Sequence, residues 1–453
     1  MGLTKVIKNS LFYALASALQ AIISFSLLPV YTRYLPPSDY AVLALVSSFV
    51  GILASVITLQ IHSGVLRFII KFQKDNNRAK NYFKSIFLLL FAVVLVSCLL
   101  IDIFGERIIS IVFSNKDNIH YSPFFRIATW TLLFNLLMSC SMLLLQTLER
   151  GRKFFLVIFA QVFINVGFGL FFVTVMKIGI IGILWAQFIS TAVAFFCALW
   201  FTRRWLGWRD FKFPVKDIKA SLRYTMPIVP HMLGIYIYMY SDRIILQRYV
   251  PLADIGIYSI ADTIASILLI VVNATSNAYS PHFFKLAEGT DSSSITGQTR
   301  KFIEVWWAAI MCIFLGFLLF SGYIVKLMTR PSFYPAIPLI SILAIAYIFR
   351  GLYCFAMNCV LFTDKTKVLP IATVSAAIIN IALNLIFIPK FGIYAAAWAT
   401  VASYSVTFII AYYFSMKYFP IRFPFVSMSK IALMVILIFL VLRFTDKIFL
   451  QCP

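Results

Sequence analysis

RYLPPSD at residues 33–39 occurs a second time, slightly changed, as RYVPLAD at residues 248–254. Other landmarks keep this spacing of 215 residues or lie within two residues of it: Asn165 and Asn380, Glu149 and Asp364, the KIGI of 177–180 and the KFGI of 390–393, and Trp185 and Trp398. Chance would not hold one register across so many positions. The sequence therefore predicts two copies of one structural unit.

The segments around these landmarks are strongly apolar. Of the 453 residues, 62% are hydrophobic and 12% are charged, and the mean hydropathy is +0.94. Because the charges cluster between long apolar runs, a soluble globular protein is excluded. Runs such as 86–101 and 431–442 are apolar on every side rather than alternating, which also excludes an outer-membrane barrel. The sequence predicts an all-α, polytopic membrane protein.

The apolar runs predict about 12–13 membrane-spanning helices. They lie near residues 10–30, 40–65, 84–104, 126–148, 154–176, 181–201, 225–249, 256–279, 302–325, 336–362, 368–388, 393–414 and 427–446. Six helices separate equivalent positions, and because six is even, both repeats enter the membrane from the same side. We therefore predict two parallel six-helix lobes around a central cavity, at residues 1–202 and 224–415, joined by a basic cytoplasmic linker at 203–223. Residues 416–453 would form an additional C-terminal helix.

The net charge of +23 follows the predicted topology. With a cytoplasmic N-terminus, most of the 39 Lys and Arg residues fall in segments on the inner side, including the linker at 203–223. This asymmetry obeys the positive-inside rule and supports that orientation. The basic excess is then a topology signal and an attraction to anionic membrane lipids, and we expect no nucleic-acid partner.

No pattern typical of an enzyme or a metal site stands out. The seven cysteines lie mostly in apolar runs without a C-x-x-C pair, and the four histidines form no H-x-x-x-H pair. There is no G-x-x-x-x-G-K-[ST] loop, so ATP-driven transport by this chain alone is excluded. We expect a protein that is not an enzyme and that has no metal or organic cofactor.

The chain also resembles a known family. The similar residues of the first span and its following turn are Asn9, Pro29, Arg33, Leu35 and the Asp39–Tyr40 pair. Together with the paired K-x-G-I and W-A elements, they resemble bacterial polysaccharide flippases. These flippases belong to a superfamily that includes the multidrug and toxin extruders and the lipid II flippases, which implies the same two-lobed fold.

The resemblance implies a flippase in the bacterial inner membrane. It would move an undecaprenyl-diphosphate-linked oligosaccharide, such as a lipopolysaccharide O-antigen or capsule repeat unit, from the cytoplasmic to the periplasmic leaflet by alternating access. Its partners would be this polyprenyl-diphosphate-linked oligosaccharide, membrane lipids and the polysaccharide polymerase machinery. Protons, sodium ions or the membrane potential would drive the cycle. The alternative is a cation-coupled multidrug extruder, which would need an acidic, aromatic-lined cavity.

A flippase for such an anion should carry buried positive charge, because a diphosphate and its sugars cannot cross about 30 Å of hydrocarbon unaided. Arg350 is the first candidate, since a charge near the bilayer centre costs at least about 2.5–3.5 kcal/mol. The alternative for Arg350 is a structural pair that fixes helix packing. Arg243 either binds the same anion or extends to the outer headgroups.

Four further residues complete the candidate set. Arg67 and His62 are expected to bind phosphate at the cytoplasmic entrance, unless Arg67 only anchors the protein to inner-leaflet headgroups. Asp262 and Asp242 are the candidates for ion coupling. Asp262 either carries a proton, if burial raises its pKa, or pairs with a nearby arginine.

Overall fold

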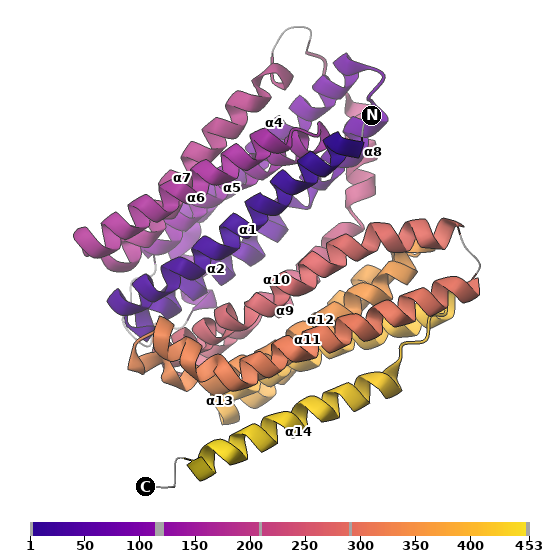
Figure 1. Ribbon diagram of the computed structural model, residues 1–453. Helices are drawn as coiled ribbons and strands as arrows, with labels where there is room; N and C mark the ends of the chain where they lie inside the picture. Colours follow the sequence, from indigo (N-terminus) through magenta and orange to yellow (C-terminus); the bar gives the residue numbers. More distant parts are fainter. Residues whose placement is uncertain (1–2, 114–121, 208–210, 290–291, 450–453) are drawn as a thin grey trace. The chain divides into compact units, whose positions relative to one another are not determined.

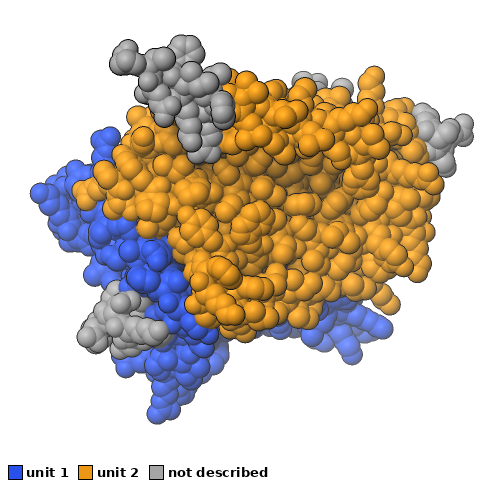
Figure 2. Space-filling model, turned by 90° about the horizontal axis from the view of Figure 1, so that it is seen from below, with its two compact units in different colours: residues 1–256 blue, residues 257–453 orange. Residues whose placement is uncertain are grey.

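The computed structural model describes residues 3–113, 122–207, 211–289 and 292–449, and every regular element within them is helical (Figure 1). Residues 208–210 of the predicted linker and 450–453 of the predicted C-terminal helix lie outside the described residues. The chain divides into two compact units, Met1–Gly256 and Ile257–Pro453 (Figure 2).

The first unit contains nine α-helices among its described residues and the start of a tenth. They are α1 (Leu3–Tyr34), α2 (Pro37–Thr58), α3 (Gly64–Lys71), α4 (Asn76–Val112), α5 (Ser122–Thr147), α6 (Gly151–Leu170), α7 (Gly179–Thr202), α8 (Val215–Thr225) and α9 (Ile228–Tyr249). Short 3₁₀ or π segments lie at η1 (Ile61–Ser63), η2 (Phe171–Val175) and η3 (Arg203–Trp205). Within this unit α7 packs against α5 and α6, where the small buried residues Ala194 and Ala198 allow close approach.

The second unit contains most of α10 (Leu252–Gly289), followed by α11 (Ser292–Met328), η4 (Pro331–Ala336), α12 (Ile337–Phe362), α13 (Val368–Tyr418) and α14 (Phe425–Phe449). The longest helix, α13, contains Gly392 with φ 54° and ψ −134°, outside the helical region. This glycine separates residues 368–391 from 393–418, and each part is long enough to cross a membrane.

The backbone confirms the predicted repeat. Helices α5 and α12 both contain 26 residues, and their bounds differ by the repeat spacing. Glu149 and Asp364, shortly after these helices, both have positive φ, at 52° and 58°. Gly179 and Gly392 also share positive φ, at 61° and 54°. Non-glycine residues rarely adopt this conformation, so its recurrence at paired positions reflects a shared fold of the two halves.

Eleven helical stretches in the described part of the chain are long and apolar enough to span a membrane. The stretch at α13 counts once among them, although Gly392 divides it into two. The predicted span at α9 is not among them, and this helix carries Asp242, Arg243 and Gln247. Counting α13 as two spans and α9 as one gives the upper predicted number of spans.

Helix α9 packs against α2 within the first unit. The contact is close because Gly51 of α2 lies under the ring of Tyr240, where a β-carbon would come within 2.9 Å of the ring. At the start of α10, a β-carbon on Gly256 would overlap the carbonyl oxygen of Pro37. The chain thus divides after Gly256, which leaves α9 in the same unit as α2, and the predicted lobe bounds around the linker at 203–223 stay a prediction.

The predicted helix at 40–65 is too long at its C-terminal end. α2 ends at Thr58 because Leu59 and Gln60 take positive φ, at 42° and 54°. The chain then turns through η1 into α3, whereas α10 continues without a break through the equivalent residues 274–275. Neither glycine nor proline stands at the break, so no local signal predicts it.

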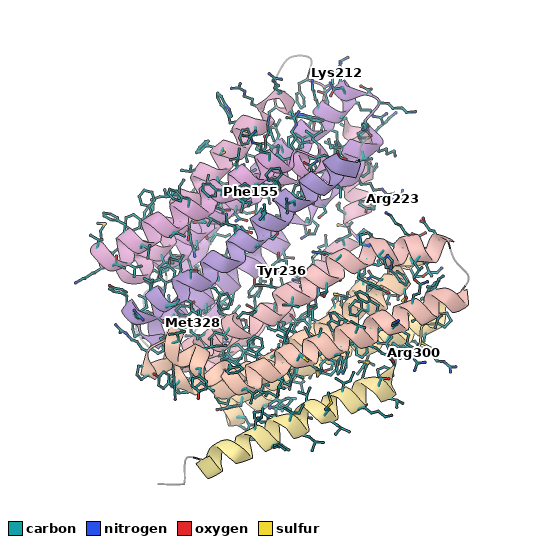
Figure 3. All side chains as sticks on the ribbon, viewed as in Figure 1. Phe155, Lys212, Arg223, Tyr236, Arg300 and Met328 are labelled. Carbon is teal, nitrogen blue, oxygen red and sulfur yellow. The ribbon has the colours of Figure 1, made fainter. Side chains whose placement is uncertain are left out.

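The linker helix α8 is attached to the first unit by polar contacts. Arg78 of α4 donates two hydrogen bonds to Asp217, at 2.7 and 2.9 Å, and the hydroxyls of Tyr82 and Ser221 lie 2.7 Å apart. The labelled side chains Lys212 and Arg223 belong to this linker (Figure 3). The predicted basic linker is thus partly helical and is held against α4.

Candidate functional site

The first unit contains two adjoining cavities of about 280 and 290 Å³, which share Thr131, Asn135 and Gln187. Their lining is rich in side-chain amides: Gln20, Asn135, Gln161, Asn165 and Gln187. Among the residues that the structure describes, no charged side chain lines either cavity. The site is therefore polar but electrically neutral.

These amides converge from four membrane-spanning helices, α1, α5, α6 and α7. Asn135 lies at the midpoint of α5, and Gln161 lies near the middle of α6. At that depth a polar group has no lipid partner, and leaving it without a hydrogen bond costs several kcal/mol. Because the amides are placed there together, the cavities are suited to water or to a polar ligand.

Part of the amide capacity is used within the protein. The Asn165 amide donates to Ser190 Oγ at 3.2 Å, and Gln161 Nε2 donates to Thr191 Oγ1 at 3.4 Å. The Oε1 atom of Gln161 is buried and accepts no hydrogen bond from the described protein atoms. Asn135 and Gln187 are exposed side chains on the cavity wall. The site thus retains both donors and acceptors for a ligand.

Sequence reasoning missed this cavity. The available signal was the occurrence of amides near the centres of four otherwise apolar spans, in particular Gln20, Asn135 and Gln161. Amides carry no charge, so they do not stand out in a search for buried ions.

Arg243 and Asp242 are both buried in α9 of the first unit, at 7% and 1% exposure. Arg243 Nη1 donates to the Met239 carbonyl at 3.0 Å and to Asp242 Oδ1 at 3.3 Å. The two predicted residues therefore form a local ion pair, which offsets part of the cost of burying each charge. A role of Arg243 in anion binding and of Asp242 in coupling stays a prediction.

Arg350 and Asp262 belong to the second unit. Asp262 of α10 accepts a hydrogen bond from the Tyr347 hydroxyl at 2.5 Å, and Tyr347 lies one helical turn before Arg350 on α12. The Arg350 guanidinium lies over the Tyr353 ring, 5.0 Å from its centroid. The second unit thus carries an acid, a phenol and an arginine on two neighbouring spans.

Arg67 and His62 lie on the short segments after α2. The Arg67 guanidinium, which is exposed, lies 4.1 Å from the centre of the Tyr224 ring of α8. His62 lies in η1, where burial lowers the pKa of its imidazole and therefore favours the neutral form. Its Nδ1 atom is buried without a hydrogen-bond partner among the described protein atoms. Phosphate binding by these two residues stays a prediction.

The repeat relates the neutral cavity to the charged residues. At the repeat spacing, Asn135 of α5 is equivalent to Arg350 of α12, and Ser47 of α2 is equivalent to Asp262 of α10. Leu132 is likewise equivalent to Tyr347. All three first-unit residues line the 290 Å³ cavity. The equivalent positions are therefore neutral in the first half and include charged residues in the second.

Comparisons with known proteins agree with this architecture. The sequence profile of a family described as polysaccharide biosynthesis proteins matches residues 6–287, more than half of the chain. A probable low-salt glycan biosynthesis flippase of Haloferax volcanii, Agl15, is 22% identical over 210 residues, which are 46% of this chain. The match spans 44% of that relative, so the chain covers less than half of its length.

Solved structures show the fold. An inward-facing multidrug resistance transporter of the MATE family aligns with 87% of this chain and 93% of its own, at 13% identity and a TM-score of 0.76. The lipid II flippase MurJ in an inward closed conformation aligns with 97% of this chain and 93% of its own, at 17% identity and the same TM-score of 0.76. The predicted two-lobed transporter fold is confirmed.

Proposed function

Since the chain belongs to the family of polysaccharide biosynthesis proteins, we propose that it is a flippase for a lipid-linked oligosaccharide. The substrate is an undecaprenyl-diphosphate-linked repeat unit of the O-antigen or capsule type. It moves from the cytoplasmic to the periplasmic leaflet of a bacterial inner membrane, and the N-terminus of the protein is cytoplasmic. The flippase name of the Haloferax volcanii relative supports this choice.

The neutral amide cavity is the observation that carries the proposal. Sugar hydroxyls crossing the hydrocarbon need donors and acceptors at mid-membrane depth, and Asn135, Gln161 and Gln187 supply them. The polyprenyl chain needs no such path because it stays in the lipid. In the second unit, Arg350 binds the diphosphate in this proposal, and Asp262, which accepts a hydrogen bond from the Tyr347 hydroxyl, is the coupling residue.

A multidrug extruder for cations is less well supported. Such a protein needs a negative charge in its cavity, and the described lining of the first-unit cavities contains amides and hydroxyls in place of acids. The two functions lead to different cellular phenotypes.

Deletion of the gene tests the proposal. We expect the lipid-linked oligosaccharide to accumulate on the inner leaflet, with surface polysaccharide lost, and we expect the wild-type gene to restore both. Leaflet location is measured by accessibility of the glycolipid to a glycosidase in inside-out and right-side-out vesicles. Unchanged glycolipid levels with increased sensitivity to cationic drugs would instead identify an extruder.

A further inference from the structure

One of the two first-unit cavities, that of 290 Å³, has an aromatic wall as well as polar residues. Tyr236 of α9 lines the 290 Å³ cavity together with polar residues that include Asn135 and Gln187. Its ring stacks on Tyr240, one turn along the helix, with centroids 6.0 Å apart and planes inclined by 23°. Tyr236 is labelled in Figure 3.

This aromatic wall is held by packing between helices. Tyr240 rests on Gly51 of α2, where only a residue without a side chain leaves room for the ring. Tyr240 in turn supports Tyr236 by ring stacking. A tyrosine fixed in this way offers an apolar ring face at little further cost in side-chain entropy.

Amides and an aromatic ring together match the two kinds of surface on a sugar. Each sugar hydroxyl can both donate and accept a hydrogen bond. A side-chain amide meets both needs, because its NH2 group donates and its oxygen accepts. The C–H face of a pyranose ring, by contrast, is apolar. Each cavity lies close to the lower end of the range of about 300–1,000 Å³ that is typical of small-molecule sites. The two together accommodate a short saccharide rather than a long one.

The neutrality of the cavity indicates which part of the substrate it takes. A diphosphate would lose hydration there without meeting a cation, because the described lining has no Lys or Arg. At the equivalent position of the second unit, Arg350 replaces Asn135. The duplicated site therefore provides one place for neutral sugar and another for negative charge.

We infer that Tyr236, Asn135 and Gln187 form a saccharide-binding subsite in the first unit, in which a neutral sugar of the oligosaccharide stacks on Tyr236 and hydrogen-bonds to the two amides. This inference rests on the proposed flippase function and adds the part of the substrate that each half recognises. The amides select for hydroxyl-rich rings, and the diphosphate binds elsewhere.

Binding to the full-length protein in lipid nanodiscs tests the subsite. Two radiolabelled probes are used: undecaprenyl diphosphate without sugar, and the undecaprenyl-diphosphate-linked oligosaccharide extracted from the deletion strain. We expect Tyr236→Ala to weaken binding of the glycosylated probe about tenfold and to leave binding of undecaprenyl diphosphate unchanged. Tyr236→Phe keeps the ring and should bind both probes as the wild type does.

Two further variants act as controls. Asn135→Leu preserves side-chain size but removes the amide, and it should show the same selective loss as Tyr236→Ala. Tyr323→Ala removes an exposed tyrosine of α11 that does not line the cavity, and it should change neither affinity. Size-exclusion profiles and thermal unfolding of each variant in nanodiscs establish that it is folded.

The outcomes separate this inference from the proposed function. Equal loss for both probes, or no loss for either, in folded Tyr236→Ala and Asn135→Leu would overturn the saccharide subsite while leaving the flippase proposal in place. Failure of the wild-type protein to bind either probe would overturn the flippase proposal and the subsite together.

Discussion

Asn135 and Arg350 occupy the same place in two copies of one helix, yet one is a neutral amide and the other a cation. Their surroundings differ in the same way, because Ser47 faces the first cavity where the second half has Asp262. The comparison shows that one fold can carry a neutral residue in one half and a cation at the equivalent position of the other.

The largest expected effect comes from removing the charge of the second half. Arg350→Ala should lower glycolipid transport by about a hundredfold or more, because a desolvated diphosphate loses its cation. Arg350→Lys should retain part of the activity, since the charge remains while bidentate geometry is lost. Transport is measured in reconstituted vesicles at matched protein content. Near-normal transport by the alanine variant would remove Arg350 from the substrate site.

The converse change makes the first half resemble the second. Asn135→Arg places a charge at the centre of a membrane-spanning helix, at a cost of about 2.5–3.5 kcal/mol unless it finds an anion. We expect transport of the glycosylated lipid to fall at least about tenfold, with folded protein still present in the membrane. Asn135→Gln keeps the amide and serves as the matched control. Wild-type transport by Asn135→Arg would show that neutrality of the first half is unimportant.

Membrane potential should act on the charged half alone. Export of about two diphosphate charges from a negative interior is favoured by roughly 2.3 kcal/mol per charge per 100 mV. Transport by wild-type protein should therefore increase several-fold under an imposed potential with proton and sodium gradients clamped. Asn135→Leu should transport more slowly but keep the same relative response. A wild-type rate that is independent of potential would contradict this assignment.

A smaller effect is expected at the contact that supports the aromatic wall. Gly51→Ser introduces the residue found at the equivalent position 266, and its β-carbon would come within 2.9 Å of the Tyr240 ring. The ring must shift, which disturbs Tyr236 and should weaken glycolipid binding by about two- to fivefold. Ser266→Gly, which makes the reverse exchange in the second half, is the control. An unchanged affinity for Gly51→Ser would show that Tyr240 does not position Tyr236.

Most of the fold could be predicted because it depends on apolar length and on the repeat. The pairs Glu149 with Asp364 and Gly179 with Gly392 mark turns whose backbone needs an unusual φ, so they kept their register through divergence. The break at Leu59 and Gln60 could not be predicted, because neither residue is a helix breaker or a type that favours positive φ.

The sequence pointed to candidate site residues only among the charged ones, and their roles stay predictions. Arg350 and Asp262 stand out because burying a charge in an apolar helix costs free energy. The amides can be recognised as a site only once the fold brings them together from four helices. The equivalence of Asn135 with Arg350 was nevertheless contained in the repeat spacing. Comparing each buried charge with its partner in the other repeat would have pointed to the cavity.

The contact between Gly256 and Pro37 leaves no room for a side chain at residue 256. Because its hydrogen is the largest substituent that the Pro37 carbonyl admits, the choice of amino acid there decides whether the first turns of α2 and α10 can touch. A leucine in this place would act as a wedge that keeps the two helix starts apart. The close packing of the two helix starts therefore depends on this one residue having no side chain.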